Sequence, residues 1–366
     1  MSTLRSMIAF AALGLASNAA AQTATPFKLG TFERAGKPFV GVVLRDTLVI
    51  DLAAAHAAVR TPASSVTAPV DMKDLIERYD AGVRTRIGQI VGAVEAAGNS
   101  RPGYVHQLTA VKILPPIMYP RVILNAAVNY TEHDAEMARR DGRTLTQAPG
   151  TALPNTRSAP GIWTRADNDT RWNPYMFLKS PSAVVADGET IRLPVGREQV
   201  DWECELGVVI GRTAHQVPLA QASNYIFGYT LENDVSDRGG RGDTRHGSDW
   251  LIAKSHDTFA PMGPFIVPKE FVPNVKNLAI KVLLNDKVMQ EGNTSQMIHD
   301  VFELVSYGTS ILTLRAGDVI ATGTPPGVGS ALTPPVYLKA GDKSVCTYEG
   351  IGTLTNPVGG PPTSTR

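Results

Sequence analysis

Short apolar runs interrupted by glycine and proline fill most of the 366-residue chain, and this pattern limits the fold more than any other feature. The 33 glycines and 26 prolines are typical of short strands joined by many turns rather than of a helical bundle. Only two helices are expected beyond residue 119, at 132–141 and 294–312. Because strands and helices do not alternate regularly, a Rossmann fold or a TIM barrel fits poorly. The strands expected in this region are 122–127, 183–185, 205–210, 226–232, 279–284, 319–322 and 344–348.

The length predicts about two domains. Residues 27–116 begin with strands at 27–32, 39–44 and 47–51 and continue with helical periodicity over 71–97, so they predict a small N-terminal α+β domain. Residues 119–357 predict a β-rich domain that carries the chemistry. Within it, residues 139–173 are polar, rich in glycine and proline, and without a clear period. A segment of this length is expected to be a lid or a binding loop.

The first 21 residues have the pattern of a secretory signal. Arg5 precedes an apolar run at 7–16, and Ala19-Ala20-Ala21 offers a small-residue cleavage site after Ala21. The run is too short to span a bilayer. We therefore expect a periplasmic or secreted protein with no membrane segment in the mature form. The formal net charge of +1 leaves no basic excess for a nucleic-acid partner.

Three acids at the ends of two expected strands indicate a metal site. Glu203 and Glu205 are two residues apart and leave the same face of a strand, and Asp234 ends another apolar run. By itself an E-x-E pair is more often two solvated acids on a sheet edge. With the third acid, and without a His/Cys cluster, the set favours a hard cation such as Mg²⁺, with Mn²⁺ or Ca²⁺ as alternatives.

These residues lie in motifs that resemble the fumarylacetoacetate hydrolase (FAH) superfamily. The resemblance covers residues 119–357 and rests on Glu203-x-Glu205, the segment N-D-V-S at 233–236, K-S-H-D-T-F-A-P-M-G-P at 254–264, N-T with M-I at 293–298, and T-G-T-P-P-G-V-G at 322–329. It implies an FAH-type β-sandwich roll behind a small N-terminal domain, which makes a β-rich α+β fold. It also implies a divalent cation, a homodimer, and activity on small dicarbonyl or 2-oxo acids, as in acylpyruvases, oxaloacetate decarboxylases and 2-hydroxyhepta-2,4-diene-1,7-dioate isomerases.

The same resemblance assigns roles to individual residues. The implied metal ligands are Glu203, Glu205 and Asp234. The implied catalytic groups are Lys254 beside the metal and a dyad of His133 and Glu136, which are adjacent on a helix face at i, i+3. The implied substrate-carboxylate loop is Thr322, Gly323 and Thr324. The working hypothesis is hydrolysis of a C–C bond in an acylpyruvate or fumarylacetoacetate type of substrate, with His133 removing a proton from water.

Several alternatives stay open at this point. The same metal cup could serve an oxaloacetate-type decarboxylase or a dienedioate isomerase or hydratase, and a non-catalytic periplasmic oxo-acid binder is the competing class. Arg238 and Arg241 depart from the family pattern and are expected either to clamp a second substrate carboxylate or to make oligomer contacts. Cys204 is interpreted as a core residue. The sequence does not place its sulfur beside that of Cys346, so a disulfide after export stays open.

Overall fold

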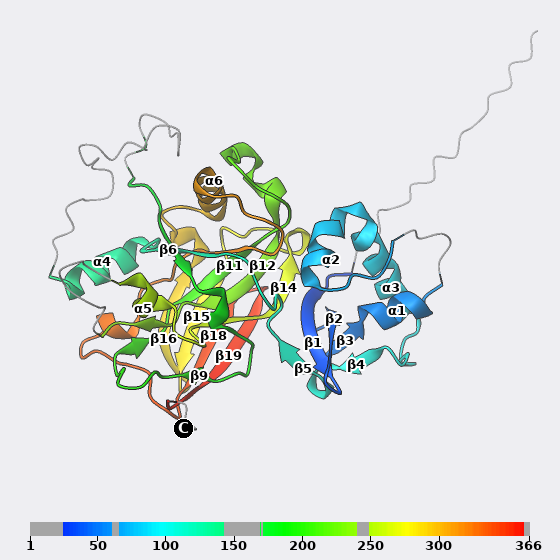
Figure 1. Cartoon of the computed structure of the whole chain (residues 1–366), viewed down its shortest axis with the longest axis horizontal. Coiled ribbons are helices and arrows are strands. Elements are labelled where there is room, and N and C mark those ends of the chain that lie inside the picture. Colours follow the sequence, from blue (N-terminus) through cyan, green and yellow to red (C-terminus); the bar gives the residue numbers. More distant parts are fainter. Residues whose placement is uncertain (1–24, 61–65, 143–168, 170, 240–248, 362–366) are drawn as a thin grey trace, which may run out of the picture.

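The computed structural model describes residues 25–60, 66–142, 169, 171–239 and 249–361. The expected signal segment, most of the 139–173 insert and Arg241 lie outside the described residues. Figure 1 shows a smaller N-terminal unit beside a larger sheet-rich unit. The combination of many strands with few helices confirms the expected β-rich α+β fold. In the described ranges, no helix combines the length and apolar character that crossing a bilayer requires.

The N-terminal unit is an antiparallel sheet covered by helices. Its strands follow the order β4-β3-β2-β1, and β5 also pairs with β1. The helix expected over 71–97 is interrupted, because Gly82 adopts a φ of 113° between the two helical halves. The elements are β1 (Lys28–Arg34), β2 (Lys37–Leu44), β3 (Leu48–Asp51), α1 (Leu52–Ala58), α2 (Met72–Arg78), α3 (Arg84–Ala96), β4 (Val105–Gln107) and β5 (Lys112–Leu114).

The larger unit contains two sheets that pack face to face. The first continues the N-terminal sheet in the order β14-β12-β11-β17-β6-β7, and the second has the order β16-β15-β18-β19-β9. The apolar cluster that includes Trp202, Cys204, Leu206 and Tyr348 draws on both sheets. The strands are β6 (Ile123–Ala127), β7 (Tyr175–Lys179), β8 (Val184–Val185), β9 (Ile191–Arg192), β10 (Val200–Asp201), β11 (Cys204–Ile210), β12 (Ile226–Asn233), β13 (Ser236–Asp237), β14 (Ala260–Pro268), β15 (Ala279–Leu284), β16 (Lys287–Asn293), β17 (Val319–Ala321), β18 (Lys343–Tyr348) and β19 (Gly352–Gly359).

Three helices border these sheets: α4 (Thr131–Arg140), α5 (Trp250–Lys254) and α6 (Val301–Ile311). α4 matches the helix expected at 132–141. α6 begins later than the expected residue 294, because Asp300 forms a capping box with Glu303 and Asn293 caps only the short turn Thr294–Gln296. Two helix N-caps, Asn293 and Asp300, therefore divide the segment that the sequence predicts as one helix.

The two units share a sheet and a core. β1 pairs with β14 in antiparallel register at Leu29 and Ile266. This pairing joins the N-terminal sheet and the first sheet of the larger unit into one sheet of twelve strands. Tyr79 of the N-terminal unit stacks edge-on against Phe227 at 4.9 Å and donates a hydrogen bond to Glu270 at 2.8 Å. One apolar cluster contains side chains of both units.

Candidate metal centre and catalytic dyad

The three predicted acids meet in the structure. Glu203 directly precedes β11, Glu205 lies within it, and Asp234 follows β12, its antiparallel neighbour. One carboxylate oxygen from each lies within 4.8 Å of those of the other two. All three side chains are buried, with Asp234 fully excluded from solvent. The alternation of a strand and the pairing of two strand ends thus produce the cluster.

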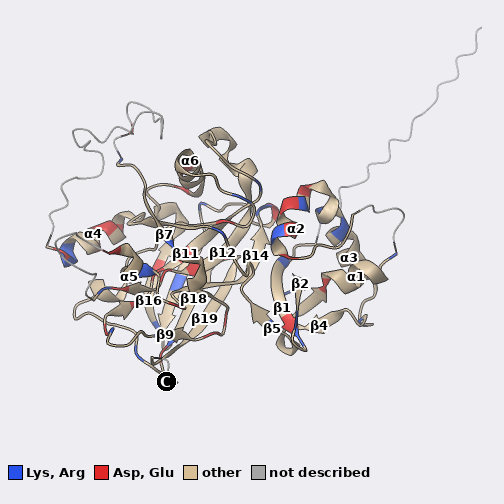
Figure 2. Cartoon of the chain, viewed as in Figure 1, with Lys and Arg blue, Asp and Glu red and all other residues tan. Residues whose placement is uncertain are grey.

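Buried cations surround the acids. Lys254, at the end of α5, donates to Glu203 at 2.7 Å and to Asp234 at 2.5 Å. Lys179, at the end of β7, is also buried and donates to Asp234 and to the Val235 carbonyl. In Figure 2, red and blue segments meet between α5 and β11 inside the larger unit. Lys254 therefore lies beside the acid cluster, where its catalytic role stays a prediction, and Lys179 is a second lysine at the same place.

Glu205 is the acid whose charge is least compensated. Among the described residues, it accepts a hydrogen bond only from the Gly323 N–H, at 2.7 Å, and no cationic side chain is hydrogen-bonded to it. Burial, together with the carboxylates of Asp234, Glu232 and Glu203, raises the pKa of Glu205 well above its ordinary value. Burial also raises the pKa of Glu232 to about 8, although Lys179 opposes this shift.

The donor set fits a divalent cation. A cluster of carboxylate oxygens without sulfur or imidazole donors suits Mg²⁺ or Mn²⁺, and such an ion would remove the repulsion that burdens Glu205. Glu203, Glu205 and Asp234 are the residues that would hold it. Glu232 is the cross-strand partner of Glu205 in the β11–β12 ladder, on the same face of the sheet, and receives a hydrogen bond from Asn125 at 3.1 Å.

The His133–Glu136 dyad is formed on the buried face of α4. The His133 Nδ1 atom lies 2.7 Å from Glu136 Oε1, and the second oxygen of Glu136 accepts the Gly327 N–H at 2.9 Å. The other ring nitrogen, Nε2, lies 4.0 Å from Oε1 of the predicted ligand Glu203. A carboxylate held on one side of the imidazole leaves Nε2 facing the acid cluster.

The Thr322–Thr324 loop already makes several contacts within the protein. Gly323 donates its N–H to Glu205, and the Thr324 hydroxyl donates to the Cys204 carbonyl at 2.9 Å. The Thr322 hydroxyl is buried and has no hydrogen-bond partner among the described residues. The loop therefore supports a predicted metal ligand, and its contact with a substrate carboxylate stays a prediction.

Of the two predicted arginines, the structure describes only Arg238. The guanidinium of Arg238 is buried and makes ion pairs with Asp201, at 2.7 Å, and with Glu203. A substrate carboxylate would have to compete with these two partners, and Arg241 lies outside the described residues. Sequence reasoning did not identify Lys179. The available signal was a lysine that closes the otherwise apolar run Y-M-F-L-K.

Comparisons with known proteins agree with this fold. Residues 122–359 match the family model described as fumarylacetoacetate (FAA) hydrolase C-terminal. The oxaloacetate tautomerase YisK of Bacillus subtilis is 31% identical over 91% of this chain and 100% of its own length. The mitochondrial oxaloacetate tautomerase fahd2 of Xenopus laevis is 31% identical over 77% of this chain and 81% of its own.

A solved structure extends the match to three dimensions. The maleylpyruvate hydrolase from Sphingobium sp. SYK-6, in complex with manganese(II) and pyruvate, superimposes with a TM-score of 0.63 at 26% identity and covers 91% of this chain and 99% of its own. The fold and the buried acid cluster thus define a sheet-rich protein of a class whose members are enzymes. The chain belongs to the fumarylacetoacetate hydrolase superfamily.

Proposed function

We propose that the protein is a divalent-metal-dependent enzyme that moves a proton on a small 2-oxo acid, with keto–enol tautomerisation of an oxaloacetate type of substrate as its reaction. The observation that carries the proposal is the 4.0 Å separation between His133 Nε2 and Glu203 Oε1, which puts a candidate base beside the acid cluster. The names of the two tautomerase relatives, one of them matched over its full length, support the choice of reaction.

In this reaction the residues of the protein move one proton from a carbon atom of the substrate to an oxygen atom of the substrate. His133 accepts a proton from the carbon next to the 2-oxo group, and the electron pair of that C–H bond forms the C=C bond of the enol. The protonated His133 then returns one proton to the former keto oxygen, which regenerates the base, so neither water nor a second substrate is consumed. Glu136 holds the imidazole in orientation, and Lys254 supplies positive charge beside the developing oxyanion. Glu203, Glu205 and Asp234 would hold a divalent cation, which would supply Lewis-acid polarisation of the 2-oxo group.

Hydrolysis of a C–C bond is the second candidate. The maleylpyruvate hydrolase relative supports it, and so does the dyad, because a base that can take a carbon-bound proton can also take one from water. Decarboxylation of a 2-oxo diacid would need less from His133, since it requires only an electron sink. A binder without turnover gives no role to a buried His–Glu pair beside the acid cluster.

The test is a substrate screen with metal control. Protein stripped with a chelator and reloaded with Mg²⁺ or Mn²⁺ is assayed for loss of enol-oxaloacetate absorbance, for cleavage of acetylpyruvate and maleylpyruvate, and for pyruvate release from oxaloacetate. We expect metal-dependent tautomerisation that falls about a hundredfold or more in His133→Ala. His215→Ala, at an exposed histidine, is the matched control and should be unchanged. Full activity after metal removal, or in His133→Ala, would refute the proposal.

We also propose that the protein is exported and forms a homodimer. The pattern of residues 1–21 supports export, and mass spectrometry of the native protein should find a mature N-terminus at Gln22. Light scattering of the purified protein should give twice the chain mass. Retention of Met1 in a cytoplasmic fraction, or a monomer at micromolar concentration, would contradict the respective expectation.

A further inference from the structure

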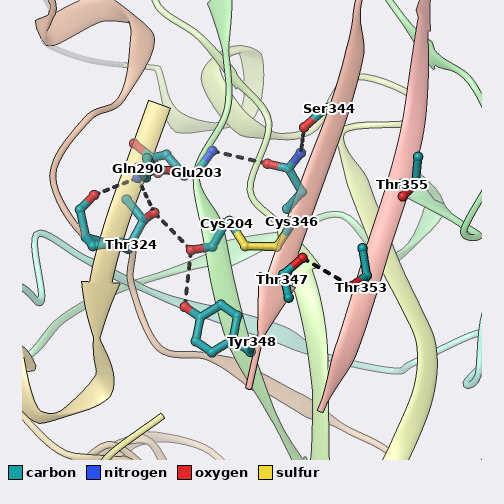
Figure 3. The surroundings of a disulfide bond; sticks show 12 residues. Glu203, Cys204, Gln290, Thr324, Ser344, Cys346, Thr347, Tyr348, Thr353 and Thr355 are labelled. Carbon is teal, nitrogen blue, oxygen red and sulfur yellow. Dashed lines mark hydrogen bonds between the residues drawn. A yellow bond between two sulfur atoms is a disulfide. The ribbon is translucent and has the colours of Figure 1, made fainter. Parts of the chain in front are cut away.

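A disulfide ties the residue between two predicted metal ligands to the opposite sheet. Cys204 lies between Glu203 and Glu205 and is bridged to Cys346 of β18, 142 residues further along the chain, with a Cα–Cα distance of 5.8 Å. Figure 3 shows the bridge between the two strands. Because side chains of a strand alternate, the sulfur enters the core while both carboxylates leave the other face. The bridge therefore fixes the backbone at Cys204, between the predicted metal ligands Glu203 and Glu205.

The same face of β18 holds the ligand segments at two further points. Ser344, Cys346 and Tyr348 are spaced two apart and are all buried. Tyr348 donates its hydroxyl to the Cys204 carbonyl at 3.3 Å, and the Thr324 hydroxyl donates to that carbonyl at 2.9 Å (Figure 3).

The third contact, from Ser344, reaches the other ligand strand. Ser344 accepts from the amide of Asn233 at 3.4 Å, and the oxygen of the Asn233 amide accepts the Glu203 N–H at 3.1 Å. Asn233 is also the neighbour of the predicted ligand Asp234. One face of one strand thus contacts the residues next to all three acids: Cys204 beside both glutamates and the Asn233 side chain beside Asp234.

The acid cluster needs such an anchor. Lysine and arginine side chains compensate Glu203 and Asp234, but among the described residues no cationic side chain is hydrogen-bonded to Glu205. Repulsion between Glu205 and the carboxylates within 4.8 Å of it therefore favours movement of their strands apart. A covalent link that holds the strands removes this freedom, so binding of the ion costs less reorganisation.

We propose that the Cys204–Cys346 disulfide is a positioning element of the metal cup, which holds the backbone between Glu203 and Glu205 in the geometry that binds a divalent cation. The inference rests on the proposed metal-dependent function. The bond forms when the two thiols give two electrons and two protons to the disulfide of a thiol oxidoreductase, which becomes a dithiol. Such oxidants act in exported compartments, which agrees with the signal pattern of residues 1–21. Both cysteines are buried, so thiols cannot reach the bond in the folded protein.

The experiment measures metal affinity against stability. Mn²⁺ binding is followed by calorimetry in the oxidised wild type, in Cys204→Ala/Cys346→Ala, and in Leu354→Ala. Leu354 is buried and pairs with Cys346 on β19, so its truncation disturbs the same core without touching the bridge. We expect the dissociation constant to rise about tenfold or more in the double variant, as for other supports of metal ligands. It should stay within about twofold in Leu354→Ala, although that variant also loses stability.

The outcomes separate the positioning role of the disulfide from the proposed function. Equal Mn²⁺ affinity in the double variant and the wild type would overturn the positioning role and leave the proposed function intact. A comparable loss of affinity in Leu354→Ala would also overturn it, because the effect would then follow stability alone. Failure of the oxidised wild type to bind Mn²⁺ would refute the proposed function, and this inference with it. Should the double variant not fold, wild-type protein refolded with a phosphine reductant keeps both cysteine side chains and lacks only the bond, and an unchanged dissociation constant there would overturn the proposal.

Discussion

Replacing Glu136 by glutamine tests the dyad most directly, because both oxygens of this carboxylate are occupied. One oxygen faces His133 Nδ1 at 2.7 Å and the other accepts the Gly327 N–H at 2.9 Å. A carboxylate only accepts, so Nδ1 carries the proton and Nε2 is free to act as a base. Glutamine has one acceptor and one donor, and it can satisfy only one of these two contacts in the native arrangement.

The expected loss in kcat follows from the two orientations that the glutamine amide can adopt. With its oxygen on Gly327, its NH₂ group faces Nδ1, which must then accept, and the imidazole proton moves to Nε2 and blocks the base. The reverse orientation points two donors at each other and leaves a buried N–H unpaired, at a cost of about 1–3 kcal/mol. The base-competent arrangement is then populated about 5- to 150-fold less. Loss of the negative charge beside the protonated imidazole slows the reaction further. We expect kcat to fall about a hundredfold, toward the 10²–10⁴ typical of losing a general base.

The assay compares kcat of Glu136→Gln, Glu136→Ala and Glu132→Gln on the best substrate, with metal saturation verified by calorimetry. Glu132 lies on the exposed side of the same helix, so its variant should match the wild type. The glutamine variant should be no faster than the alanine variant, although it is nearly isosteric with the native residue. Loss of a general base lowers kcat by about 10²–10⁴. If Glu136→Gln instead keeps more than about half of the wild-type kcat, the dyad has no part in proton transfer.

Three further predictions concern the stability of the fold. Lys179→Met removes a buried cation from Asp234 and should lower the free energy of unfolding of metal-free protein by about 3 kcal/mol in urea titrations; an unchanged value would contradict the ion pair. Burial opposes ionisation of Glu303, but hydrogen bonds from His299 and Arg171 outweigh it and lower the pKa of Glu303 to about 2. Its contribution to stability is therefore present above the unfolded pKa of about 4.3 and is lost as pH falls toward 2, so acid titrations of Glu303→Gln should lack this part of the pH dependence. Chelation of the metal should lower the melting temperature, because an ion at a hundred times its dissociation constant stabilises the fold by about 2.7 kcal/mol, and an unshifted calorimetric transition would argue against the metal site.

The site residues that the sequence predicts are those whose relation is visible in local spacing. Glu203 and Glu205 share a face because strands alternate, and His133 and Glu136 share one because helices bring i and i+3 together. The family motifs then relate these local pairs to one another. Lys179 has no such local signal, because its partner Asp234 is 55 residues away and only the sheet order brings them into contact.

Tertiary context also explains β14, one of the strands that the sequence does not predict. β14 contains Pro261, Pro264 and Pro268, which normally argue against an interior strand, yet it is buried throughout. Its pairing with β12 shifts register between Tyr229 and Leu231, so the ladder is interrupted opposite the central proline. The Cys204–Cys346 bridge is likewise a product of sheet packing, since the sequence leaves its pairing open.

The pairing of β1 with β14 has a consequence for biogenesis. Leu29 and Ile266 are more than 200 residues apart, so the first strand leaves the ribosome long before β14 exists. Until then β5 pairs with only part of β1, and the N-terminal unit exposes the uncovered edge around Leu29 together with apolar side chains that end in the shared core. Nascent chains of this kind should depend on a holding chaperone, and translation stalled before residue 260 should yield aggregating fragments rather than a folded N-terminal domain.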